Sequence, residues 1–252
     1  MIVQIYEIQS PEEAEAMIDL GVDHIGTVIV SSQQCQNPVL KATVETIQSS
    51  GCKSSLIPLL DDIPTISSLI AYYQPDIIHF CETLTQSAMG RNDPSDPLYR
   101  QARIRKRFPE LAIMRSIPIG APGAGDAVPS LQWAALFEPT SDYFLTDTLL
   151  TAGDPCIKSD LDTVQPVTGF VGITGQVCDW QLARRLVKQS RIPVILAGGI
   201  GPANVAEGIA NVNPAGIDSC TLTNAVDGCG RSIRFKKDRD KVKALVHAAR
   251  QA

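Results

Sequence analysis

The stretch from Val194 to Val205, VILAGGIGPANV, holds the residues whose types and spacing point most directly to chemistry. An apolar run typical of a strand buried on both faces stops at Gly198-Gly199-Ile200-Gly201, and Pro202 then suits the first turn of a helix. A glycine-rich turn that opens a helix points unpaired backbone N–H groups at one place, where an anion can bind. The stretch therefore indicates an anion site, although an ordinary strand–helix loop with glycines for tight packing would look the same.

The elements that must position this loop alternate along the whole chain. The expected strands are 2–8, 23–30, 54–60, 75–80, 111–119, 142–147, 192–198 and 216–221. The expected helices are 10–21, 38–51, 63–74, 98–108, 130–138, 179–190, 202–212 and 238–251. The first helix has the clearest boundaries, with Ser10 as N-cap, Pro11 in the first turn, Glu13 completing a capping box and Gly21 ending it.

This order of elements predicts an α/β fold, a (β/α)8 TIM barrel, in a single domain spanning residues 1–252. A doubly wound open sheet is the alternative, but its glycine-rich fingerprint follows the first strand, where this chain reads QSPEE without a glycine. Two segments interrupt the alternation, an insertion or loop at 83–97 and a long loop at 148–178 after the sixth strand. In such a barrel phosphate is commonly held after strands seven and eight, which is where the glycine stretch falls.

The composition excludes several classes of protein. The chain has 252 residues, of which 44% are hydrophobic and 19% charged, as in a soluble globular protein that buries a substantial core. The net charge of −5 argues against a nucleic-acid-binding protein. The one basic run, Arg234 to Lys243, is interleaved with acids, and we expect it to be the solvated start of a helix.

Cysteine and histidine usage points to a reducing compartment and to no metal. The 7 cysteines show no C-x-x-C spacing, and the 3 histidines, His24, His79 and His247, lie far apart, so we expect free thiols. The N-terminus lacks a signal-peptide pattern, and no run approaches the ~18 apolar residues that span a bilayer. We therefore expect a cytoplasmic protein that contacts no membrane.

Several stretches resemble the phosphoribosylanthranilate isomerases of tryptophan biosynthesis. GITGQVCDW, Gly172 to Trp180, resembles the family's G-G-T-G-x-x-F-D-W, and ILAGGIGPANV is similar to its L-A-G-G-L-x-P-x-N-V. GIDSCTLTN, Gly216 to Asn224, stands where the family has G-V-D-V-S-S-G-V-E, and DYFLTDT matches the strand that ends in the catalytic aspartate. The resemblance covers most of the chain and implies a TIM barrel.

The resemblance also implies a reaction and the residues that carry it. Family members convert an N-linked ribosylamine phosphate to a ketose by an Amadori rearrangement, which needs an acid at the ring oxygen and a base at C2. The acid would be Asp147. The family's base is a cysteine at the end of the first strand, and Tyr6 stands there in this chain. Glu7 could substitute only if it lies past the strand end, because neighbouring strand residues face opposite sides.

Other positions depart from the family pattern or fit it loosely. Cys81 replaces an inward histidine after the fourth strand and is either a relocated base or a small buried filler. After the second strand the family has an arginine that grips the substrate's aromatic carboxylate, whereas this chain has Gln33 and Gln34, which cannot form the charge-assisted pair. Arg115 would substitute if it points inward. Leu222 replaces a phosphate-loop glycine. The expected phosphate-binding set is Gly175, Gly198, Gly199, Gly201, Thr221 and Thr223.

Three further residues have both a structural and a functional interpretation. Asp179 is more simply a helix N-cap, and Trp180 can serve packing instead of recognition. Asp218 is either buried for structure or part of the site.

The sequence as a whole predicts an isomerase of the phosphoribosylanthranilate type with a non-standard base and no cofactor. The alternative is a catalytically inactive or repurposed phosphosugar-binding barrel, and a different reaction at the same site is a third hypothesis. The expected partner is a small phosphorylated ligand, with no nucleic acid and no membrane. A homodimer is the assembly left open.

Overall fold

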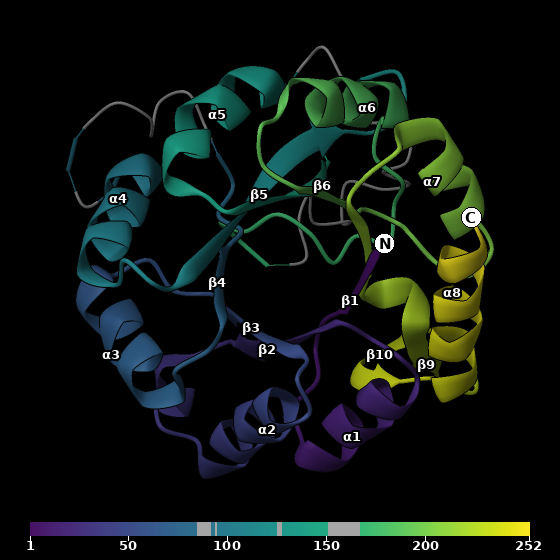
Figure 1. Ribbon diagram of the computed structural model, residues 1–252, viewed down its shortest axis with the longest axis horizontal. Coiled ribbons are helices and arrows are strands. Elements are labelled where there is room, and N and C mark those ends of the chain that lie inside the picture. The colour runs from purple at the N-terminus through teal and green to yellow at the C-terminus, as the bar shows by residue number, and fades with distance from the viewer. Residues whose placement is uncertain (85–91, 94, 125–127, 151–166) are drawn as a thin grey trace.

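The computed structural model describes residues 1–84, 92–93, 95–124, 128–150 and 167–252. Eight parallel strands close into a barrel in the order of the sequence (Figure 1). They are β1 (Ile2–Ile5), β2 (His24–Ile29), β3 (Lys53–Pro58), β4 (Ile77–Phe80), β5 (Ala112–Gly120), β6 (Tyr143–Leu149), β7 (Val194–Leu196) and β8 (Gly216–Ser219). Closure is made by β1 against β8, where Gln4 is in register with Asp218. The predicted TIM barrel is confirmed, and the open sheet is wrong.

The helices lie outside the strands (Figure 1). They are α1 (Pro11–Asp19), α2 (Pro38–Ser49), α3 (Ile63–Tyr73), α4 (Pro97–Arg107), α5 (Ser130–Phe137), α6 (Trp180–Gln189), α7 (Val205–Val212) and α8 (Arg239–Gln251). Short 3-10 turns are Ser32–Gln34, Glu138–Thr140 and Thr221–Thr223. Within the described residues, no helix combines the length and apolar character needed to cross a membrane.

The first helix follows its predicted boundaries with one difference. Ser10 caps α1 by accepting a hydrogen bond from the Glu13 backbone N–H at 3.3 Å. The Glu13 carboxylate, however, accepts from the backbone N–H of Lys237 at 3.2 Å. The expected second half of the capping box is thus replaced by a contact that joins α1 to the C-terminal part of the chain.

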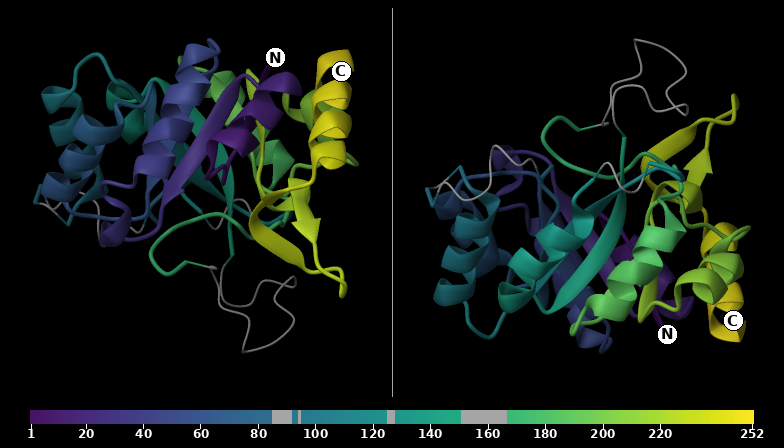
Figure 2. Two further views of the ribbon diagram at one scale, coloured as in Figure 1. Left: turned by 90° about the horizontal axis from the view of Figure 1, so that it is seen from below. Right: turned by 90° about the horizontal axis from the view of Figure 1, so that it is seen from above.

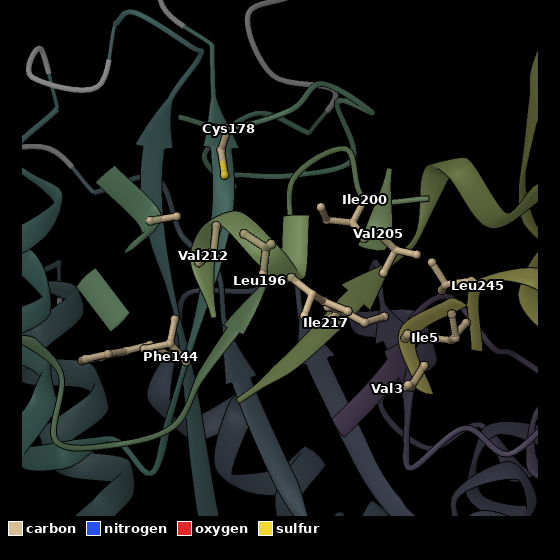
Figure 3. Packing of buried hydrophobic residues seen from close by; sticks show 14 of the residues in the cluster. Val3, Ile5, Phe144, Cys178, Leu196, Ile200, Val205, Val212, Ile217 and Leu245 are labelled. Carbon is tan, nitrogen blue, oxygen red and sulfur yellow. The ribbon is translucent and has the colours of Figure 1, made fainter. Parts of the chain in front are cut away.

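Apolar side chains pack on both sides of the strands. The largest cluster fills the space between the strands and the helices outside them, and Figure 3 shows the part around β7, β8 and β1. A smaller cluster lies inside the barrel, where Val28, Ile57, Met114, Leu145 and Ile195 meet. Every strand therefore buries both faces, as continuous apolar strands require.

A two-stranded antiparallel hairpin, β9 (Asn224–Val226) and β10 (Ser232–Lys237), is inserted between β8 and α8. The prediction of a solvated helix start at 234–243 is wrong for its first four residues, which belong to β10. Lys237 is buried, and its ammonium donates to the Asn224 side chain at 2.5 Å and to the Cys220 carbonyl at 2.9 Å. These bonds make a charged residue tolerable in a buried strand. Helix α8 begins only after the Asp238 cap.

The hairpin lies at the end of the barrel where the strands finish, away from the two termini (Figure 2). The described part of the segment 148–178 is at the same end. Its Phe170 forms a bridge with Glu82, and the Val171 N–H donates to the Cys81 carbonyl at 2.8 Å. Parts of the two predicted loops, residues 85–91, 94 and 151–166, lie outside the described residues.

Candidate active site

Two adjoining pockets open at the C-terminal ends of the strands. The glycine pocket, of about 360 Å³, is formed by Ile173–Gly175, Ala197–Ile200 and Ser219–Leu222. The apolar pocket, of about 550 Å³, is formed by the ends of β1 to β4 and by the segment from Val167 to Ile173. Four residues line both pockets, and they are Asp147, Ile173, Asp218 and Cys220. The arrangement offers one polar and one apolar chamber, joined where two carboxylates lie.

The glycine pocket brings together the loops that follow β7 and β8. Gly199 has φ +61°, and a Cβ there would lie 2.5 Å from the Gln176 carbonyl carbon, so no other residue fits. Within the described part of the chain, the backbone N–H groups of Gly199, Thr221 and Leu222 meet no acceptor. Free amides that converge from two loops suit an anionic group.

Not every residue of the expected phosphate set reaches this pocket. Gly175 and Gly198 line it, together with Gly199 and Thr221. The Gly201 N–H instead donates to the Asn204 side chain at 2.8 Å, so its amide is already occupied. Thr223 is fully buried, and its hydroxyl donates to the Cys220 carbonyl at 3.0 Å. Gly201 and Thr223 therefore support the loops and do not line the pocket.

Asp147 lies on β6 at the junction of the two pockets. Its Oδ1 accepts from the Thr148 N–H at 2.9 Å, and burial raises the pKa of the carboxyl to about 7. The loop backbone packs directly on the carboxylate, since a Cβ on Gly172 would lie 2.4 Å from Oδ2. A carboxyl group in this state is half protonated near neutral pH, which suits a general acid.

Asp218 has both of the roles that its sequence position suggested. Its Oδ1 accepts from the Gln4 side chain at 3.1 Å, and it also lines both pockets. Burial and then the charge of Asp147 raise its pKa to about 7. Asp147 and Asp218 together therefore carry less than two negative charges near neutral pH.

Tyr6 points into the barrel, but its phenol is sealed. The hydroxyl is 2.6 Å from Ser55 Oγ and 2.7 Å from His79 Nδ1, and the ring fills the space beside Gly26. Burial raises the pKa of Tyr6 well above its usual value. Burial also lowers the pKa of His79 to about 3, and its Nε2 lies 2.8 Å from Ser116 Oγ. Both groups stay neutral near pH 7, so the phenol is not a base.

Glu7 lies past the end of β1, which finishes at Ile5. Its backbone has φ +67°, its side chain is 1% exposed, and it lines the apolar pocket. The Arg234 Nε of the hairpin donates to its Oε1 at 2.7 Å. The condition set by the sequence for a role of Glu7 is therefore met.

Comparisons with known proteins assign the family. A family model described as N-(5'phosphoribosyl)anthranilate (PRA) isomerase matches residues 158–248. The N-(5'-phosphoribosyl)anthranilate isomerase 2 of Methanosarcina mazei is 31% identical over an alignment that covers 99% of this chain and 94% of that protein. The chain belongs to the N-(5'-phosphoribosyl)anthranilate isomerase family.

Solved isomerases of this name share the barrel. The enzyme from Pyrococcus furiosus aligns over 100% of both chains with a TM-score of 0.65 and 18% identity. A phosphoribosyl anthranilate isomerase in complex with reduced 1-(o-carboxyphenylamino)-1-deoxyribulose 5-phosphate aligns over 100% of both chains with a TM-score of 0.65 and 16% identity. At these identities the likeness shows the fold alone.

Two residues that the isomerase resemblance suggested for the site cannot fill those roles. Cys81 has the wrong protonation state, and Arg115 points away from the pockets. Cys81 lines the apolar pocket, but burial raises the pKa of its thiol well above the usual value, so it is not a thiolate. Arg115 faces the helices because it alternates with the inward Met114 on β5. It is fully buried, 2.5 Å from Glu82 and 2.8 Å from Gln101. The condition that Arg115 points inward is not met.

The remaining candidates of the isomerase pattern lie outside the pockets. Gln33 is exposed, and the Gln34 side chain accepts from the Val30 N–H at 2.8 Å. Asp179 caps α6 by accepting from the Gln181 N–H at 2.9 Å, which confirms its structural interpretation. Trp180 packs with its ring 3.4 Å from the Cβ position of Gly208. Among the described residues directly after β2, no arginine stands where the family has the one that binds the substrate's carboxylate.

Proposed function

We propose that this chain catalyses the isomerisation of N-(5'-phosphoribosyl)anthranilate to 1-(o-carboxyphenylamino)-1-deoxyribulose 5-phosphate. The observation that carries the proposal is Asp147, a carboxyl with a pKa of about 7 placed between an amide-lined pocket and an apolar pocket. The membership of the family supports the same reaction. The proposed binding-only barrel is not favoured, because the carboxyl that the reaction needs is present and suitably protonated.

The substrate's three parts match the three parts of the site. The phosphate would accept hydrogen bonds from the amides of Gly199 and Thr221, beside Gly175 and Gly198. The aromatic ring would occupy the apolar pocket between Ile57 and its neighbours. The ribose would then lie at the junction, next to Asp147.

The reaction needs protons at two points of the ribose. Asp147 would donate its proton to the ring oxygen, which breaks the bond from that oxygen to C1 and leaves a protonated imine. Removal of the proton from C2 then gives an enolamine, which tautomerises to the ketone. Hydrogen moves within one substrate, so the net reaction needs no oxidant, reductant or cofactor.

Steady-state turnover with purified protein tests the proposal. We expect the wild type to convert N-(5'-phosphoribosyl)anthranilate, and Asp147→Asn to lower kcat by ~10²- to 10⁴-fold, the usual contribution of a general acid. Asp142→Asn is the control, because Asp142 directly precedes β6 and pairs with Arg105 outside the two pockets. Its kcat should stay near that of the wild type. A wild type that binds the substrate without turnover would instead support a binding barrel.

Location and assembly are proposals of the same kind. We infer a cytoplasmic location from the free-thiol usage of the sequence. A homodimer is a prediction that sedimentation equilibrium can test.

A further inference from the structure

We propose that Glu7 is the general base that removes the C2 proton, held in place by Arg234 of the β9–β10 hairpin. The inference rests on the proposed isomerase function and names the group that this function lacks. Neither Tyr6 nor Cys81 can take the proton, because burial raises the pKa of both well above their usual values. The base must therefore come from another residue at the pocket.

The backbone at Glu7 is what brings its side chain to the pocket. A residue directly after Tyr6 in a regular strand would face the helices. Strand β1 ends at Ile5, however, and Glu7 adopts φ +67°, a conformation that L-residues with a Cβ rarely take. Such outliers persist where the surroundings hold them and are frequent at functional sites. With this turn Glu7 lines the apolar pocket, which Asp147 also lines.

The hairpin supplies what holds this carboxylate. Arg234 Nε donates to Oε1 at 2.7 Å, and the backbone N–H of Phe235 lies 3.5 Å from Oε2. A charge-assisted hydrogen bond of this kind fixes the orientation of a carboxylate. Arg234 is therefore a positioning residue, and the hairpin is the element that carries it to the mouth of the barrel.

The other charged and titratable groups near Glu7 lie on β6, on β10, and on or directly after β8. Cys220, which directly follows β8, lies beside Glu7, and burial raises the pKa of this thiol. Asp218 of β8 and Asp147 of β6 line the same pocket, and Lys237 of β10 binds the Cys220 carbonyl. Asp218 is the competing carboxylate, but Gln4 already holds its Oδ1.

The proposed step balances without a co-reactant. The C2–H bond breaks, its proton goes to the Glu7 carboxylate, and its electron pair forms the C1–C2 double bond as the imine nitrogen becomes neutral. The proton gained by Glu7 passes to solvent, from which Asp147 recovers the proton it gave to the ring oxygen. The enol then tautomerises, and the product has the composition of the substrate.

The test compares variants at pH 5 to 9 in the turnover assay. We expect Glu7→Gln to lower kcat by ~10²- to 10⁴-fold with KM within about fivefold of wild type. Glu7→Asp should recover ~10-fold or more over Glu7→Gln, because it retains a carboxylate. Binding of reduced 1-(o-carboxyphenylamino)-1-deoxyribulose 5-phosphate, measured by calorimetry, shows that each variant is folded.

Arg234 gives a readout that a purely structural role would not move. In Arg234→Gln kcat should fall by ~10-fold or more while KM stays within about fivefold of wild type, because the carboxylate loses the hydrogen bond that orients it. Arg231→Gln is the matched control, since Arg231 pairs with Asp227 inside the same hairpin. Its kcat and KM should equal those of the wild type.

The outcomes separate this inference from the proposed function. An active wild type with an equally active Glu7→Gln variant overturns the role of Glu7 alone. The same holds if Asp218→Asn lowers kcat by ~10²-fold or more and Glu7→Gln lowers it by less than ~10-fold. An inactive wild type overturns the isomerase function, and the role of Glu7 with it.

Discussion

At the scale of single residues, the burial of Asp147 determines the pH dependence that we expect of the proposed reaction. As the proposed general acid Asp147 must be protonated to act, and its pKa is about 7. We therefore expect kcat/KM to fall as pH rises through about 7, with a slope of one proton. A pH–rate profile with the wild type checks this. Full activity maintained to pH 9 would mean that another group supplies the proton.

Tyr6 has a different role, which stability measurements can reveal. Its hydroxyl joins Ser55 and His79, so Tyr6→Phe leaves two buried polar groups without their partner. We expect the free energy of unfolding in urea to fall by ~1–3 kcal/mol, with kcat within about fivefold of wild type. Tyr72→Phe is the matched control, because Tyr72 keeps its edge contact with Tyr73. A fall in kcat without a fall in the free energy of unfolding would show that Tyr6 takes part in the reaction.

The sequence predicts single residues well only where alternation or a motif determines their direction. The positions of Asp147, Gly198 and Gly199 at the pocket followed from motifs, whereas Gly201 of the same motif does not line it. Asp179 followed from its place at a helix start. Glu7 depended on where β1 ends, which no local pattern states. Arg115 shows the opposite case, since alternation against Met114 settles its outward direction once the strand's register is known.

At the scale of elements, we expect the loops after β7 and β8 to bind the phosphate only if their backbones stay close together. In Gly199→Ala the new Cβ would collide with the Gln176 carbonyl carbon and displace the loop. Each charge-assisted hydrogen bond lost is worth about 1.5–3 kcal/mol, so we expect KM to rise by ~10-fold or more.

The control for this prediction is Gly228→Ala in the hairpin turn, where a Cβ meets nothing within 4 Å. Its KM should equal that of wild type. An unchanged KM in Gly199→Ala would place the phosphate elsewhere.

The elements themselves follow from the sequence except at the hairpin. Continuous apolar runs and helix caps mark eight strand–helix units, because each strand buries both faces. The run RFKK is not a continuous apolar run. Lys237 is nevertheless buried, because three atoms accept hydrogen bonds from its ammonium, and the partly buried Arg234 pairs with Glu7. A charged residue in a sequence predicts an exposed position, but hydrogen-bond acceptors from other segments allow Lys237 to be buried.

At the scale of the whole molecule, ionisation of a buried site carboxylate lowers the free energy of unfolding. Burial raises the pKa of Asp218 from 3.8 to about 7. Its contribution to stability is therefore full below pH 3.8 and is lost as pH rises through about 7. Asn cannot ionise, so Asp218→Asn avoids this loss.

We expect the free energy of unfolding of wild type to fall by ~2–4 kcal/mol more than that of Asp218→Asn between pH 4.5 and 8.5. Urea unfolding at the two pH values measures this difference. Asp61→Asn, at an exposed position, should parallel the wild type. If the free energy of unfolding of Asp218→Asn changed with pH as that of the wild type does, the pKa of Asp218 would not be raised by burial.

The most direct test of the central claim is a crystal structure with reduced 1-(o-carboxyphenylamino)-1-deoxyribulose 5-phosphate. We predict that its phosphate lies within ~3 Å of the Gly199 and Thr221 amides, with the sugar chain between Asp147 and Glu7. A phosphate bound away from these amides, or a sugar that touches neither carboxylate, would contradict the account.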